Sequence, residues 1–221
     1  MYIVIIGAGR TGSSVIELAN RDNQDVVVVE RDPEIAEEIS TTYDCMVINA
    51  DATSKEILLE AGIEEADALI STTDDESVNL MVSMLGKQYD VETIVSSIEN
   101  PDHIELFRDL GVSVVESPHR LNGRYLYRAV KRPEIEDLMD ITGPAEIFEL
   151  TVDDNAPIAG HNLVEAYDEG LIGDDTIVVA VRHDGELTIP DGQTVIESGA
   201  SVTVLARSGA TDRVIDPFNG T

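Results

Sequence analysis

The sequence predicts an α/β protein with a doubly wound parallel sheet, followed by a small α+β domain. One observation is the apolar run of residues 1–6, which leads without a gap into Gly7-Ala8-Gly9-Arg10-Thr11-Gly12. The other is a pattern of apolar strand, polar turn and amphipathic helix that repeats as far as residue 118. Six such units predict a Rossmann sheet with the strand order 3-2-1-4-5-6.

The expected elements follow from apolar runs and from the helix-like spacing between them. Strands are expected at residues 1–6, 25–29, 45–48, 66–70, 93–96 and 112–115. Helices are expected near residues 12–21, 33–42, 54–61, 75–88 and 101–109. Pro33 and Ser54 suit the first positions of their helices.

The glycine motif between the first strand and the first helix predicts a phosphate site. Gly7 suits a tight turn, Gly9 lets backbone N–H groups approach a pyrophosphate, and Gly12 lets the helix pack closely on the strand. The positive end of the helix dipole then faces the anion. A chance glycine-rich turn is the alternative, and the strand, helix, strand and acid that occur here in order argue against it.

Glu30 ends the second expected strand, eighteen residues after Gly12. An acid at this place accepts hydrogen bonds from ribose hydroxyls in dinucleotide-binding folds. Its charge repels a 2′-phosphate, so NAD, NADH or an adenine nucleotide is favoured over NADP. Arg31 follows directly and moderates that preference.

A cationic helix is expected after Pro118. Arg120, Arg124, Arg128 and Arg132 recur every four residues and share one helix face. One interpretation is a surface helix whose arginines pair with acids elsewhere in the chain. The other is a helix that docks a second subunit or a partner.

The remaining chain predicts a second small domain. An alternating strand at 147–152, an apolar strand at 176–181 and a strand at 201–205, with turns at 182–185 and 189–192, make residues 145–207 β-rich. A short helix is expected near 162–167. The polar residues from Ser208 are expected to fray. The predicted division is a nucleotide-binding domain at 1–118, a connecting or dimerisation helix at 119–140, a C-terminal domain at 141–207 and a flexible tail at 208–221.

Composition limits the function classes. The net charge is −30, with 44 acidic and 14 basic residues, so most of the surface repels nucleic acid. Evenly spread acids indicate a halophile, and the alternative is a binder of basic partners or multivalent cations. No apolar run is long enough for a membrane span, and no signal peptide is apparent. Cys45 is the sole cysteine, and the four histidines have no metal-ligand spacing, so no metal site is predicted.

These residues resemble the TrkA regulatory family of Trk potassium-uptake systems, whose domains are also called KTN or RCK. The resemblance starts at residues 5–12 and covers nearly the whole chain. Its other segments are Asp51-Ala52-Thr53, Ala61-Gly62-Ile63, Ala66-Asp67-Ala68, Thr72–Glu76 with Asn79, Asn100-Pro101, Leu110-Gly111-Val112 and Ser117-Pro118, and then 145–207 as an RCK-C domain. Ala50 replaces a glycine of the family pattern, and Gly199-Ala200 replaces a usual Gly-Asp.

The resemblance implies a nucleotide site and a partner. Beyond the glycine motif and Glu30, it assigns Ala50, Asp51 and Ala52 to the adenine side, and Thr73 and Asp74 to the far side of the crevice. Ser97 stands where the family often carries a phosphate-binding arginine, which weakens the expectation of tight ATP binding. The implied ligands are NAD or NADH, with ATP, ADP or AMP in the same site.

The resemblance also implies how the protein acts. The implied partner is a membrane potassium-transporter subunit of Trk or Ktr type, at the cytoplasmic face of the membrane. The chain is expected to form a homo-oligomer, a dimer that assembles into a tetramer or an octamer, and not to enter the membrane itself. No catalytic residue is assigned.

Two other functions remain as alternatives. A small NAD-dependent oxidoreductase shares the nucleotide fold, but it needs a proton donor or acceptor beside the nicotinamide and a substrate domain. His119 is the histidine nearest the right region, and it is better explained as a loop residue. A nucleotide-sensing transcription regulator is disfavoured by the charge of −30 and by the lack of a helix-turn-helix pattern.

Overall fold

The computed structural model describes residues 1–220 and divides the chain into two compact units between Arg124 and Tyr125. Each unit has its own sheet and its own apolar core. No described helix is long and apolar enough to cross a membrane.

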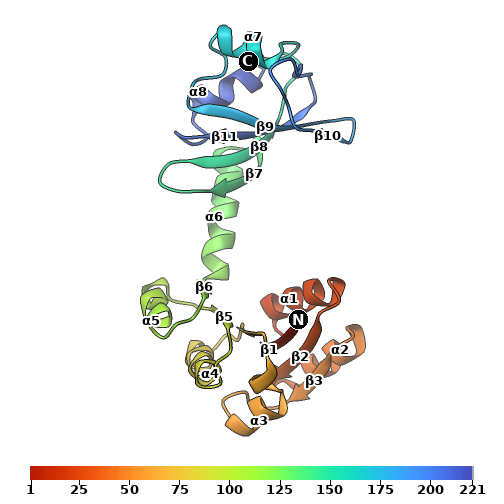
Figure 1. The fold of residues 1–221 in the computed structure, drawn as a ribbon, viewed down its shortest axis with the longest axis vertical. Helices are drawn as coiled ribbons and strands as arrows, with labels where there is room; N and C mark the ends of the chain where they lie inside the picture. Colours follow the sequence, from red (N-terminus) through yellow and green to blue (C-terminus); the bar gives the residue numbers. More distant parts are fainter. Residues whose placement is uncertain (221) are drawn as a thin grey trace. The chain divides into compact units, whose positions relative to one another are not determined.

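A parallel six-stranded sheet forms the centre of the first unit (Figure 1). Its strands are β1 (Tyr2–Ile6), β2 (Asp25–Glu30), β3 (Met46–Asn49), β4 (Ala68–Ser71), β5 (Thr93–Ser97) and β6 (Val114–Glu116). The order β3-β2-β1-β4-β5-β6 confirms the prediction. The order reverses at β1, which pairs with β2 on one side and with β4 on the other, so a crevice is expected where β1 and β4 end.

Helices cover both faces of this sheet. They are α1 (Arg10–Arg21), α2 (Pro33–Thr42), α3 (Lys55–Glu60), α4 (Glu76–Gln88) and α5 (Ile104–Asp109), with short 3₁₀ turns at Ile63–Glu65 and Pro101–His103. Side chains alternate along β1, so Ile3 and Ile5 pack in the core with α1 and α2. Val4 and Ile6 pack in the core with α3, α4 and α5. Burial on both faces explains why these strands read as continuous apolar runs.

The second unit contains an antiparallel five-stranded sheet in the order β10-β9-β11-β8-β7. The strands are β7 (Ile135–Asp140), β8 (Glu146–Thr151), β9 (Thr176–His183), β10 (Glu186–Thr188) and β11 (Ser201–Ala206). Two helices, α7 (Leu163–Asp168) and α8 (Asp212–Ile215), and a 3₁₀ turn at Asp216–Phe218 contribute to a single core. Asp184 and Gly185 both have positive φ, which is the two-residue hairpin turn that the sequence predicts.

The cationic helix is shorter than the predicted 119–140 segment. Helix α6 runs from Pro118 to Lys131, and the unit boundary lies within it. Residues 135–140 form the edge strand β7, which the sequence analysis missed. Pro133 is the physical reason, because a proline disfavours helical backbone at the residue before it.

The prediction of a frayed tail from Ser208 is wrong for residues as far as 218. Val214, Ile215 and Phe218 belong to the core of the second unit, and Phe218 is only 1% exposed. Helix α8 and the 3₁₀ turn that follows it contribute these three apolar side chains to the core, while Asp212, Arg213 and Asp216 are exposed. An apolar face of three residues is too short to be recognised from composition alone. The last residue of the predicted tail, at 221, lies outside the described residues.

Candidate functional site

The glycine loop between β1 and α1 has three glycines with three different surroundings. Gly7 has φ +85°, and its N–H donates to Val29 O at 2.9 Å. A Cβ on Gly12 would lie 2.0 Å from Gly7 O, so this glycine is required for packing. A Cβ on Gly9 would meet nothing within 4 Å, so the backbone here is open to a ligand. The turn at Gly7 and the close packing at Gly12 agree with the motif, and the role of Gly9 in ligand approach stays a prediction.

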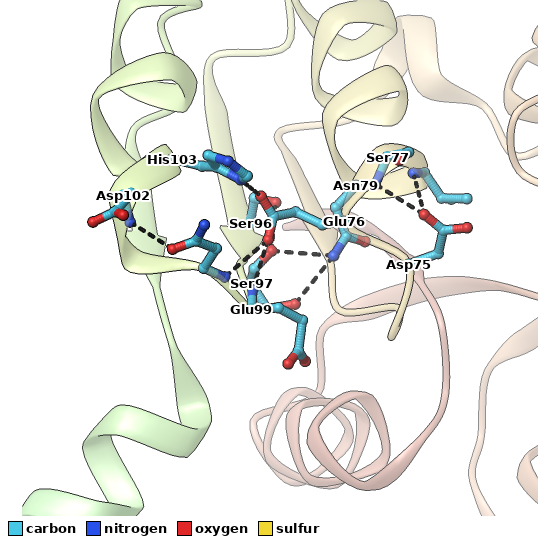
Figure 2. Close-up of polar contacts among 11 residues, drawn as sticks. Asp75, Glu76, Ser77, Asn79, Ser96, Ser97, Glu99, Asp102 and His103 are labelled. Carbon is cyan, nitrogen blue, oxygen red and sulfur yellow. Dashed lines mark hydrogen bonds and ion pairs between the residues drawn. The ribbon is translucent and has the colours of Figure 1, made fainter.

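Helix α1 starts without a side-chain cap, unlike α2 and α4. Gly9 is its N-cap residue, and its first turn contains no acid. At α2, Asp32 accepts a hydrogen bond from Glu34 N at 2.9 Å, and at α4, Asp75 accepts one from Ser77 N at 2.9 Å. Figure 2 shows the second of these caps. The N–H groups and the positive dipole end of α1 are therefore left for an anion.

Glu30 braces the glycine loop in addition to facing the crevice. Its carboxylate is only 7% exposed, and it accepts Ala8 N–H at 2.6 Å and Asp32 N–H at 2.8 Å. Each carboxylate oxygen can accept a second hydrogen bond, so a ribose hydroxyl can still bind. The sequence predicted the ribose role but not the bracing role.

Thr72 and Thr73 hold the opposite side of the loop. Thr72 Oγ1 donates to Gly7 O at 3.0 Å, and Thr72 N donates to Ile6 O at 2.8 Å. A Cβ on Gly7 would lie 2.9 Å from Thr73 Cγ2, so Thr73 packs directly against the glycine loop. The ends of β1 and β4 thus form one continuous rim.

A cavity of about 210 Å³ lies between these elements. Eight predicted site residues line it: Gly7, Gly9, Glu30, Ala50, Asp51, Ala52, Thr73 and Asp74. Ala8 and Arg10 line a neighbouring hollow beside α2, whereas Thr11, Gly12 and Ser97 line neither. The other lining residues were not predicted as site residues: Ile6, Val29, Arg31, Asp32, Ile35, Thr72, Asp75 and Val78. Several follow directly on a strand end, and that position is the signal that points to them.

The cavity lining is acidic, and most of its carboxylates are already hydrogen-bonded. Backbone and hydroxyl hydrogen bonds from Thr53, together with the nearby Arg31 charge, hold the pKa of Asp51 below its ordinary value. Asp32 and Asp75 cap helices. Asp74 makes no hydrogen bond or ion pair within the part of the chain that the structure describes, and it is exposed. It is therefore the carboxylate most available to a ligand.

Family models match both units of this chain. The TrkA-N domain model matches residues 3–118, and the TrkA-C domain model matches residues 147–219. The chain belongs to the TrkA family. It is 31% identical over 221 residues to a Trk system potassium uptake protein TrkA homolog of Methanothermobacter thermautotrophicus, covering 100% of both chains. A Pyrococcus horikoshii homolog is 30% identical over 97% of this chain and 95% of its own length.

Solved structures share the fold of this TrkA-family chain. The GsuK channel bound to NAD superposes with a TM-score of 0.69 at 20% identity, and covers 100% of this chain. This chain spans 40% of that channel chain. The Shewanella denitrificans Kef C-terminal domain in its AMP-bound form has a TM-score of 0.53 at 22% identity, covering 59% of this chain and 80% of its own.

Proposed function

We propose that this chain binds NAD or NADH in the first unit and thereby regulates a membrane potassium transporter. The diphosphate lies against the backbone N–H groups of the glycine loop and the first turn of α1. The adenosine lies toward Glu30, Asp51 and Ala52, and the second half of the dinucleotide lies toward Thr73 and Asp74. ATP, ADP and AMP compete for the adenosine and phosphate positions.

One observation carries the proposal: the open Gly9 and the uncapped start of α1 face a cavity at the reversal of strand order. The two other long helices of this unit, α2 and α4, satisfy the corresponding N–H groups with Asp32 and Asp75, whereas α1 does not. An anion is the natural partner for such N–H groups. Fold relatives bound to NAD and to AMP support the same ligand class.

The regulatory role rests on the family, whose curated members are named potassium uptake proteins. In this mechanism the ligand binds one conformation of the assembled chains more tightly than another. That difference in affinity shifts the population, and the transporter subunit responds. The protein then acts at the cytoplasmic face of the membrane, through its partner.

Self-association through α6 is part of the proposal. The helix contains no buried residue, and Leu126, Tyr127 and Val130 are 64%, 68% and 82% exposed. Apolar side chains so exposed on a helix indicate a surface that another chain covers. The double variant Tyr127→Ser/Val130→Ser is expected to lower the mass measured by light scattering. An unchanged mass contradicts self-association through this helix.

Isothermal titration with NAD, NADH, ADP and AMP at high salt tests the nucleotide site. Gly9→Val fills the open space beside the loop, so we expect at least a hundredfold loss of affinity and an intact fold. Glu186→Val is the control, because it adds the same branched side chain at an exposed position of β10, outside both the glycine loop and α6. Wild-type protein that binds none of the nucleotides, or Gly9→Val protein that binds them normally, contradicts the site.

The oxidoreductase alternative is tested by turnover. The residues lining the cavity, within the described chain, include no histidine, lysine or tyrosine to exchange a proton with a substrate. We therefore expect no NADH oxidation when the protein is incubated with candidate carbonyl substrates. Steady turnover that Gly9→Val abolishes replaces the regulatory proposal with an enzymatic one.

A further inference from the structure

Asn79, on the second turn of α4, is buried beneath the far wall of the cavity and is 1% exposed. Its side-chain amide bonds to three separate segments. Oδ1 accepts Ser71 Oγ–H at 2.7 Å, at the end of β4. Nδ2 donates to Ser97 O at 3.1 Å and contacts Ser97 Oγ at 3.3 Å, at the end of β5 (Figure 2).

The third segment is the loop between β4 and α4, and here the amide contacts Thr73 at three atoms. Asn79 Oδ1 accepts Thr73 N–H at 3.1 Å and Thr73 Oγ1–H at 2.8 Å. Asn79 Nδ2 donates to Thr73 O at 2.9 Å. The backbone donor, the backbone acceptor and the hydroxyl of one loop residue are therefore all fixed by a single buried side chain.

Thr73 has no β-ladder partner to hold it, because β4 ends at Ser71. The Asn79 amide instead supplies hydrogen bonds to the backbone of Thr73, and these bonds form without a ligand. The loop is therefore already ordered in the folded protein, so ligand binding loses no free energy in ordering it. Thr73 in turn packs on Gly7 and lines the cavity together with Asp74.

We propose that Asn79 is a positioning residue that preforms the half of the site beyond the phosphates. This proposal rests on the proposed nucleotide site and deepens it. Asn79 holds Thr73 and Asp74 where the second half of a dinucleotide binds, while the adenosine half is held by Glu30 and the glycine loop. Loss of the amide therefore weakens NAD binding selectively and leaves AMP binding almost unchanged.

The test compares NAD and AMP affinities of Asn79→Ala with those of wild-type protein by isothermal titration. Three lost hydrogen bonds to the loop predict about a tenfold or larger loss for NAD and less than about a threefold loss for AMP. Ser83→Ala is the matched control, because Ser83 is fully buried on the same helix and donates to Asn79 O at 2.8 Å without contacting the loop. We expect it to leave the NAD-to-AMP affinity ratio unchanged.

A purely structural role for Asn79 lowers both affinities by the same factor, and that result overturns the proposal. So does a ratio that stays at its wild-type value. If Asn79→Ala does not fold, Thr73→Val decides, because it keeps the shape of the side chain and removes the Oγ1 contacts with Asn79 Oδ1 and with Asp75 O. It must then lower NAD affinity about threefold with AMP affinity retained. Wild-type protein that binds neither nucleotide contradicts the proposed function itself, and with it this role.

Discussion

The two units differ in how far the polar groups of their loops are hydrogen-bonded within the chain. In the second unit, two loops are closed by side chains: Asn162 and Glu165 form a reciprocal capping box at α7, and Asp153 accepts the N–H of Gly220 at 2.8 Å, although the four-residue α8 has no side-chain cap. In the first unit, the start of α1 has no cap and Asp74 has no partner within residues 1–220. Both features lie on one cavity.

This difference indicates that the residues available to a ligand and the residues that stabilise the fold can be mutated separately. The first unit buries both faces of its sheet in two cores, so its stability does not depend on the crevice at the strand ends. The second unit has one core on one face of its sheet, while Ile177 and Val179 on β9 are exposed. We therefore expect mutations in the second unit to act mainly on stability. Mutations at the crevice of the first unit act mainly on ligand affinity.

The largest effect is expected from Phe218→Ala in the single core of the second unit. Removing a phenylalanine that is 1% exposed leaves a cavity and costs about 3–5 kcal/mol of unfolding free energy. Urea denaturation measures the loss. Leu187→Ala is the control, because this side chain is 65% exposed and its removal costs less than about 0.5 kcal/mol. Equal costs for the two variants contradict a structural role for the final segment.

Gly12→Ala tests packing in the first unit. The added Cβ would lie 2.0 Å from Gly7 O, so α1 or the loop must shift, at a cost of about 2–3 kcal/mol. Gly9→Ala meets no neighbour and is expected to cost less than about 1 kcal/mol. Urea denaturation of both proteins separates a glycine needed for packing from one needed for ligand approach. A Gly12→Ala protein as stable as Gly9→Ala contradicts this division.

The parallel sheet could be predicted from sequence because burial on both faces gives long apolar runs, and the glycine motif fixes the start of the order. The position of Glu30 at the end of β2 could be predicted in the same way, and this residue lines the cavity. The contacts of Asn79 could not be predicted, because its partners lie at the ends of two strands and in a loop, and only the folded chain brings these three segments together. Strand β7 and residues 212–218 were missed because a proline and a very short helix leave almost no periodicity to detect.

Glu76→Gln tests how the first unit fixes its loops at the strand ends. Glu76 accepts the N–H groups of Glu99 at 2.9 Å and Asn100 at 3.0 Å and pairs with His103 (Figure 2). Burial alone raises the pKa of Glu76, but these hydrogen bonds and the His103 charge outweigh it and lower the pKa below its ordinary 4.5. A carboxyl group whose pKa is lower in the folded state than in the unfolded chain stabilises the fold above about pH 4.5. This contribution is lost as the pH falls through the folded-state pKa.

We therefore expect wild-type protein to exceed Glu76→Gln by about 1 kcal/mol near pH 7. The difference shrinks as the pH falls below about 4.5, and urea denaturation across pH 7 to 3 measures it. Glu105→Gln is the control, because its pair with Arg108 is exposed and contributes little. A difference that grows as the pH falls below about 4.5 contradicts the assigned sign.

The smallest expected effect concerns Asp74, the cavity carboxylate that has no hydrogen-bond or ion-pair partner within residues 1–220. The nicotinamide ring of NAD carries a positive charge, whereas the ring of NADH carries none. If the second half of the dinucleotide lies beside Asp74, Asp74→Asn weakens NAD binding more than NADH binding, by about two- to fivefold. Titration at low salt and at 1 M KCl measures this ratio, and screening is expected to reduce it. Glu186→Gln, an equal loss of exposed charge in the second unit, is expected to leave the ratio unchanged. If both variants change the ratio equally, the effect belongs to net charge, and the nicotinamide lies elsewhere.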